Sequence, residues 1–83
     1  MERIIEVEFE TRCKSAKTAI ERFFKKFPTL DYWKENFEYM AENNIDFFSD
    51  NKLADGTKNK EWAYALQFDS TEDFHYLCII ERA

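Results

Sequence analysis

Residues 3–10 read Arg-Ile-Ile-Glu-Val-Glu-Phe-Glu, a stretch in which apolar and acidic side chains alternate. Successive side chains of a β-strand point to opposite faces of the sheet, so this alternation predicts a strand. One face would carry Ile5, Val7 and Phe9, and the other Ile4, Glu6, Glu8 and Glu10. The first strand is therefore expected to cover a core with one face and to expose a row of carboxylates on the other.

Two helical patterns follow this strand. The first begins after Ser15, a good N-cap, and ends before Pro28, and its apolar residues recur at helical spacing. These residues are Ala16, Ala19, Ile20, Phe23, Phe24 and Phe27. The second pattern runs from about Leu30 to Asn44, with an apolar stripe of Leu30, Trp33, Phe37, Met40 and Ala41. We expect both helices to pack on one face of a sheet.

The C-terminal half is predicted to form strands. Residues 45–48 and 62–68 are apolar and aromatic, and Asp55-Gly56 between them predicts a type I′ hairpin turn. Residues 74–82 are ambiguous, because the preceding Ser-Thr-Glu-Asp could cap a helix. The β-branched pair Ile79-Ile80 favours a strand.

These elements give the order β-α-α-β-β-β and predict an α+β fold. The expected architecture is a two-layer sandwich in which a mainly antiparallel sheet carries two helices on one face. We expect a single domain over residues 1–83. The predicted registers place an apolar set on the face away from the helices, namely Phe48, Ala63, Ala65, Leu77 and Ile79. Such a patch suggests a homodimer or another protein contact through the outer sheet face.

Composition limits the class of protein. The chain has 83 residues, 45% of them hydrophobic, with 9 Phe, 4 Tyr and 2 Trp, which is too apolar for a disordered chain. No apolar run approaches the ~18 residues of a membrane span, and no secretory signal is recognisable at the N-terminus. We therefore expect a cytoplasmic protein that does not enter a membrane.

The sequence gives little support for an enzyme. Cys13 and Cys78 are predicted to be reduced thiols, and His75 would point to the opposite strand face from Cys78, half exposed. The single glycine excludes the glycine-rich loops that bind nucleotide phosphates. If Gly56 is placed at the sixth position of a calcium-binding loop, Leu53 and Trp62 fall at ligand positions. Neither side chain can bind calcium, so the motif is excluded. We predict no catalytic residue, no cofactor and no metal.

Charge is distributed unevenly along the chain. The formal net charge is −5, but residues 12–26 carry +5 and the remainder −10. The basic residues are Arg12, Lys14, Lys17, Arg22, Lys25 and Lys26. An ordinary solvent-exposed face explains them most simply, and a nucleic-acid binder that uses this helix is the functional alternative.

The second helix has the most informative pattern. At ~100° per residue, its carboxylates form one ridge opposite the core stripe, composed of Asp31, Glu35, Glu38 and Glu42. A flank of Tyr32, Asn36, Tyr39 and Asn43 lies between the ridge and the core, and such residues suit a binding face. We predict that ridge and flank, with Glu6, Glu8 and Glu10, bind a partner. The alternative to a binding surface is an ordinary acidic face turned to solvent. If the carboxylates imitate the phosphates of a nucleic acid, the helix and the first strand would have to act together.

The segment Asp31-Tyr32-Trp33-Lys34-Glu35-Asn36-Phe37-Glu38 resembles a helix of barstar-type ribonuclease inhibitors that begins Glu-Tyr-Tyr-Gly-Glu-Asn-Leu-Asp. Lys34 stands where that family has glycine, and the C-terminal half lacks the further helix of the family. What the resemblance implies is a binding strategy, in which acids and tyrosines occupy a basic nucleic-acid site.

The leading functional prediction is a small acidic, non-enzymatic inhibitor that blocks the basic site of a nucleic-acid-handling protein. A phage or mobile-element protein directed at a bacterial defence complex, such as an anti-CRISPR protein, is the first form of this prediction. An immunity protein or antitoxin that neutralises a nuclease toxin is the second. Direct nucleic-acid binding through residues 12–26 belongs to a different class and is less favoured, because the net charge is negative.

Overall fold

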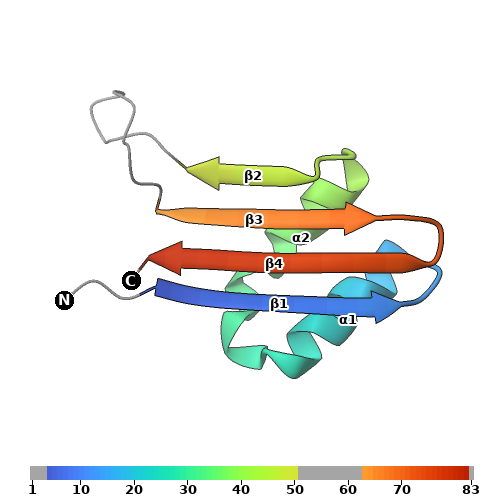
Figure 1. Ribbon diagram of the computed structural model, residues 1–83, viewed down its shortest axis with the longest axis horizontal. Coiled ribbons are helices and arrows are strands. Elements are labelled where there is room, and N and C mark those ends of the chain that lie inside the picture. Colours follow the sequence, from blue (N-terminus) through green and yellow to red (C-terminus); the bar gives the residue numbers. More distant parts are fainter. Residues whose placement is uncertain (1–3, 51–62, 83) are drawn as a thin grey trace.

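The computed structural model describes residues 4–50 and 63–82. Figure 1 shows the strands of the sheet in front and the helices behind them. In chain order the elements are β1 (Ile4–Arg12), α1 (Ala16–Lys26), the 3-10 helix η1 (Pro28–Trp33), α2 (Lys34–Glu42), β2 (Phe47–Asp50), β3 (Tyr64–Ser70) and β4 (Phe74–Arg82). Asp55, Gly56 and Trp62 of the expected hairpin lie outside the described residues.

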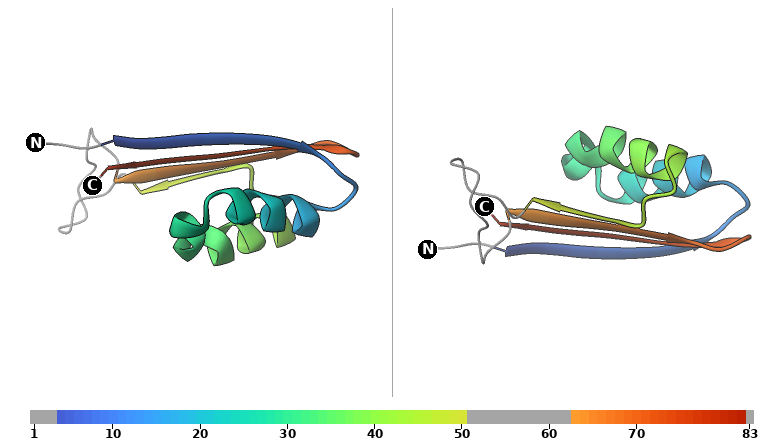
Figure 2. Two further views of the ribbon diagram at one scale, coloured as in Figure 1. Left: turned by 90° about the horizontal axis from the view of Figure 1, so that it is seen from below. Right: turned by 90° about the horizontal axis from the view of Figure 1, so that it is seen from above.

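The strands form one antiparallel sheet in the order β1-β4-β3-β2. Both helices lie on the same side of this sheet, and the other side is free of helices (Figure 2). The predicted α+β sandwich of two layers is therefore confirmed, and residues 74–82 form a strand as expected. We call the side without helices the open face.

Capping residues explain where the helices begin and end. The Ser15 hydroxyl accepts a hydrogen bond from the Thr18 backbone N–H at 3.1 Å and so caps α1. At the end of α2, Asn44 has a positive φ of 55°, and the Ile45 N–H donates to the Met40 carbonyl at 2.9 Å. This is a Schellman motif, and asparagine tolerates the left-handed conformation that it requires.

The second helix is shorter than predicted. Periodicity predicted one helix from about Leu30 to Asn44, but the structure forms η1 and then α2, with the boundary between Trp33 and Lys34. The Trp33 indole N–H donates to the Glu81 carboxylate at 2.8 Å. This contact holds η1 on β4 independently of α2, and no local pattern of residues 30–44 reveals it.

The predicted register of β4 is wrong. Leu77 and Ile79 are fully buried beneath the helices, whereas Tyr76, Cys78 and Ile80 belong to the open face. Both sets of alternate residues in β4 are apolar, so alternation could not choose between them.

The predicted face of Phe48 is wrong as well. Phe48 pairs with Leu66 and stacks on Tyr64 at 6.0 Å, which places it on the helix side and Phe47 on the open face. Ala65 is on the open face as predicted, because it pairs with Ile80. The open face therefore carries apolar residues, as expected, but they include Phe47, Cys78 and Ile80 in place of Phe48, Leu77 and Ile79.

Aromatic packing around Phe23 joins the two layers. The Phe23 side chain is 0% exposed, and its ring lies 4.8 Å from Phe24, 5.4 Å from Phe27 and 5.7 Å from both Phe9 and Phe37. These rings come from β1, α1, α2 and the segment between the helices, so one side chain connects most of the core.

Replacing Phe23 with alanine should lower the free energy of unfolding by about 3–5 kcal/mol, the usual cost of removing a fully buried phenylalanine. Urea unfolding followed by tryptophan fluorescence measures the change. Phe47→Ala is the matched control, because Phe47 is 58% exposed on the open face, and it should cost less than about 1 kcal/mol. Equal losses in the two variants would contradict this description of the core.

Candidate partner-binding surface

The acidic ridge, Asp31, Glu35, Glu38 and Glu42, is exposed as predicted. Asp31 belongs to η1, and the three glutamates lie on α2 opposite Phe37 and Met40, which are 0% and 1% exposed and anchor α2 in the core. Among residues 4–50 and 63–82, no hydrogen bond or ion pair engages the four ridge carboxylates. These charges are therefore available to a partner.

Of the ridge charges on α2, Glu35 favours the helix, because it lies in the first turn where the dipole suits an anion, but Glu38 and Glu42 do not. Glu38 and Glu42 are four residues apart, a spacing at which like charges destabilise a helix. Glu42 is the last residue of α2, where the helix dipole disfavours an anion, and no basic residue lies in that turn. By contrast, α1 ends with Lys25 and Lys26, as the dipole favours. Helix stability therefore does not explain why the ridge is acidic.

A groove runs along one flank of the ridge, between α2 and β2. It has a volume of about 220 Å³ and is lined by Glu35, Asn36, Tyr39, Met40 and Phe48. Tyr39 is 57% exposed and Phe48 39% exposed, so both rings can contact a partner. The structure thus brings three predicted site residues together and adds Phe48, which sequence reasoning placed on the opposite face.

A second groove lies on the other flank, between α1 and α2. Its lining includes Lys17 from α1 together with Glu38 and Glu42 from the ridge, and its volume is about 440 Å³. Lys17 is exposed, so the basic side of α1 begins immediately beside the ridge. A partner that covers this groove would meet acidic and basic groups side by side.

Tyr32 occupies a more constrained position than predicted. Its hydroxyl donates to the Glu81 carboxylate, at 2.6 Å from Oε2 and 2.9 Å from Oε1, and its side chain remains 55% exposed. The hydrogen bond to Glu81 is the main cause that raises the pKa of Tyr32, followed by burial. Glu81 lies 49 residues away in sequence, so sequence reasoning missed it.

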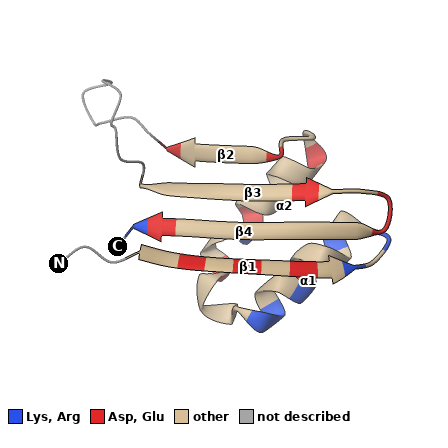
Figure 3. Cartoon of the chain, in the orientation of Figure 1, with Lys and Arg blue, Asp and Glu red and all other residues tan. Residues whose placement is uncertain are grey.

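The predicted strand carboxylates lie on the open face. Glu6, Glu8 and Glu10 are exposed along β1, and the Tyr76 hydroxyl donates to Glu8 at 2.9 Å. Burial, and then this hydrogen bond, raise the pKa of Tyr76. Figure 3 shows acidic residues at intervals along β1, and basic residues on α1 behind the sheet.

The structure does not combine the two predicted acidic groups into one surface. The ridge belongs to the helix layer, and Glu6, Glu8 and Glu10 face away from that layer. The structure therefore does not place the carboxylates of α2 and β1 in one continuous run. Side-chain alternation fixed the strand face correctly, but it could not show that the ridge points in the opposite direction.

The basic residues of the α1 region are all exposed, and part of their charge is engaged within the protein. The Arg22 guanidinium donates to the Thr11 hydroxyl at 3.0 Å and to the Arg12 carbonyl at 3.1 Å. The Lys26 ammonium lies over the Phe9 and Phe27 rings, 5.8 and 5.6 Å from their centroids. These contacts give Arg22 and Lys26 structural roles.

The histidine is buried, contrary to the expectation of half exposure. His75 is 2% exposed, its Nε2 lies 3.0 Å from the Cys13 carbonyl oxygen, and its Nδ1 is hydrogen-bonded to the Ser70 hydroxyl. The Cys13 N–H also donates to the Asp73 carbonyl at 3.0 Å. His75 therefore fastens the β1–α1 connection to the β3–β4 turn, and it faces away from Cys78 as strand alternation predicted.

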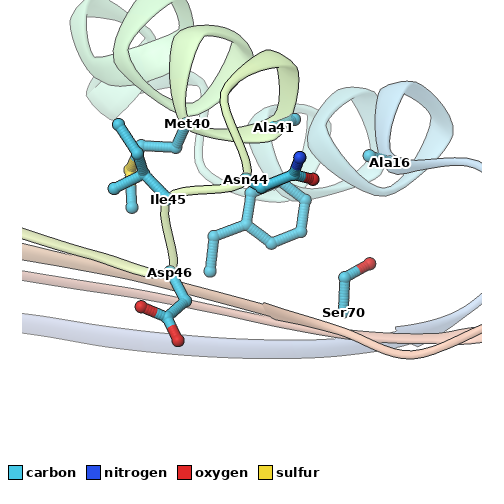
Figure 4. Close-up of a pocket in the computed structure, with 8 residues that line it drawn as sticks. Ala16, Met40, Ala41, Asn44, Ile45, Asp46 and Ser70 are labelled. Carbon is cyan, nitrogen blue, oxygen red and sulfur yellow. The ribbon is translucent and has the colours of Figure 1, made fainter.

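A cavity of about 380 Å³ lies at the C-terminal end of α2. Met40, Ile45 and Phe68 supply apolar walls, and the Asp46 carboxylate points away from the helices (Figure 4). The Ser70 hydroxyl at its margin is already bonded to His75. Across the part of the chain that the structure describes, no group of three or more His, Cys, Asp or Glu side chains could hold a metal ion.

Comparison with protein-family models, with curated proteins and with solved structures finds no match to this chain. The segment 31–38 that resembles the barstar-type helix is divided between η1 and α2, and Lys34 is the first residue of α2. In the described ranges, no helix is long and apolar enough to cross a membrane.

Changing Glu81 to glutamine should lower the pKa of Tyr32 toward its ordinary value of 10.0, because the carboxylate charge that favours the protonated hydroxyl is removed. NMR titration of ring-labelled tyrosines measures this change. Tyr76, which bonds to Glu8, is the internal control, and its pKa should not move. An unchanged Tyr32 pKa would show that Glu81 does not hold this side chain in solution.

Proposed function

We propose that this protein is a small, non-enzymatic inhibitor that binds a basic, nucleic-acid-handling protein and blocks its site. The observation that carries the proposal is the ridge of Asp31, Glu35, Glu38 and Glu42, exposed and unpaired among the described residues although Glu38 and Glu42 disfavour α2. Charges that cost helix stability are expected where function requires them.

The carboxylates of the ridge are complementary to a basic surface of the kind that binds phosphates. Successive carboxylates at Glu35, Glu38 and Glu42 rise by ~4.5 and ~6 Å along α2, so they can meet several lysine or arginine side chains. Tyr39 and Phe48 supply aromatic contact area beside the charges, and Asn36 supplies a polar amide. The protein would act by occupying the basic site and so blocking access of nucleic acid to it.

The uneven charge supports the same reading. The overall net charge of −5 attracts a basic partner, and the +5 of residues 12–26 gives the molecule a dipole that orients it during encounter. Two partner classes fit this chemistry. The first is a bacterial defence complex such as a CRISPR effector, which would make the protein a phage anti-defence protein. The second is a nuclease toxin, which would make it an immunity protein.

The triple variant Glu35→Lys, Glu38→Lys and Glu42→Lys tests the proposal. The partner is first captured from lysate of the producing cell with the tagged protein, identified by mass and purified. We expect the variant to bind it at least ~100-fold more weakly, about 2.7 kcal/mol, because attractive pairs become repulsive. The variant exchanges one set of like charges along α2 for another, so urea unfolding of the variant is measured beside its affinity to show that it folds.

The matched control reverses Glu21, Glu72 and Asp73 to lysine, which changes net charge equally at exposed positions outside the ridge. It should retain most of the affinity. The proposal also requires that the captured partner bind nucleic acid, and that the parent protein displace that nucleic acid. Equal affinity of the two triple variants, or a partner that binds nucleic acid unhindered in the complex, would overturn the proposal.

The competing function is direct binding of nucleic acid through α1. Its basic side chains are exposed, but Arg22 is engaged by Thr11 and the Arg12 carbonyl. We expect no gel shift with single-stranded or duplex probes at low salt, where phosphate contacts are strongest. A salt-sensitive shift that is lost in Lys17→Glu and Lys25→Glu would favour the competing function instead.

A further inference from the structure

We propose that the free edge of β1 binds an extended segment of a partner protein in which apolar residues alternate with lysine or arginine. This segment would pair antiparallel with β1 and extend the sheet by one strand. The proposal concerns a different surface from the ridge of α2 and does not rest on the proposed inhibitor function.

The backbone of β1 offers an unusually long free edge. β1 spans Ile4–Arg12, nine residues, and pairs in continuous register with β4 on one side. It is the terminal strand of the sheet, so no described strand pairs with its other side. At this edge the Arg12 carbonyl accepts a hydrogen bond from Arg22. Natural edges are usually short, bulged or interrupted by proline, and β1 is none of these.

The helix side of β1 leaves the core incompletely covered. Val7, Phe9 and Phe27 pack against the core but are only half-buried, and the Lys26 stem reaches over the two phenylalanine rings. Apolar side chains of an added strand would lie beside Val7 and Phe9 and complete the cover. One face of the incoming strand is therefore expected to be apolar.

The open face of β1 determines the charge of the incoming strand. Glu6, Glu8 and Glu10 are exposed at alternate positions. If a second copy of β1 paired antiparallel with Glu8 opposite Glu8, Glu6 would face Glu10, and like charges directly opposite each other destabilise a sheet. A strand with lysine or arginine at the facing positions is stabilised instead. Charge thus disfavours a second copy and selects a basic segment.

Together, the three features specify one kind of ligand. The unpaired backbone groups of β1 can pair with an extended strand. The half-buried side chains of Val7 and Phe9 favour apolar residues at alternate positions of that strand, and the glutamates favour basic residues between them. The result is a segment of about seven residues with the pattern basic-apolar-basic. If the glutamates only protect the edge from aggregation, such a segment will not bind.

A synthetic peptide tests this proposal on the intact protein. The probe is acetylated Lys-Val-Lys-Val-Lys-Val-Lys amide, and the control peptide has the same composition with its lysines and valines in separate blocks. NMR titration should show at least ~10-fold tighter binding of the alternating peptide, and hydrogen exchange should slow in β1. Equal affinity of the two peptides, or slowed exchange elsewhere than β1, would overturn the proposal.

Charge exchange gives a second test. The variant Glu6→Lys with Glu10→Lys should lose at least ~10-fold in affinity for the lysine peptide and gain affinity for the corresponding Glu-Val peptide. The ridge variant with lysine at positions 35, 38 and 42 should bind the lysine peptide as the parent does, since α2 lies on the other side of the sheet. Unchanged affinity in the Glu6 and Glu10 variant would contradict the proposal, whatever the result for the inhibitor function.

Discussion

The packing of Phe23 is the interaction on which the rest of the structure depends. Its ring is fully buried and contacts Phe9 of β1, Phe24 of α1 and Phe37 of α2. Because this contact draws both helices to one side of the sheet, the other side is left open. The molecule therefore has two chemically distinct faces, and its acidic side chains are divided between them.

This division separates the two proposed binding surfaces, which share the same type of residue. On the helix layer, carboxylates border a groove with exposed Tyr39 and Phe48. On the sheet, Glu6, Glu8 and Glu10 accompany an unpaired strand edge. The first arrangement suits the side chains of a folded basic surface, and the second suits an extended basic segment. A protein with both could bind two different parts of one partner.

Local periodicity predicted much of this structure. The alternation of residues 3–10 fixed both faces of β1, and helical spacing placed the ridge of α2 correctly in solvent. The β4 register was wrong because its two residue sets are equally apolar, and the length of α2 was wrong because Trp33 is held by Glu81. The opposite orientation of the two acidic groups depends on layer packing, which no local pattern encodes.

The central claim is that α2 is the surface that meets the basic partner. Hydrogen exchange of the protein, alone and bound to its captured partner, tests this claim most directly. We expect binding to slow hydrogen exchange in Lys34–Glu42 and in β2 beside it, while α1 exchanges as it does in the free protein. Slowed exchange confined to α1, with α2 unchanged, would contradict the claim.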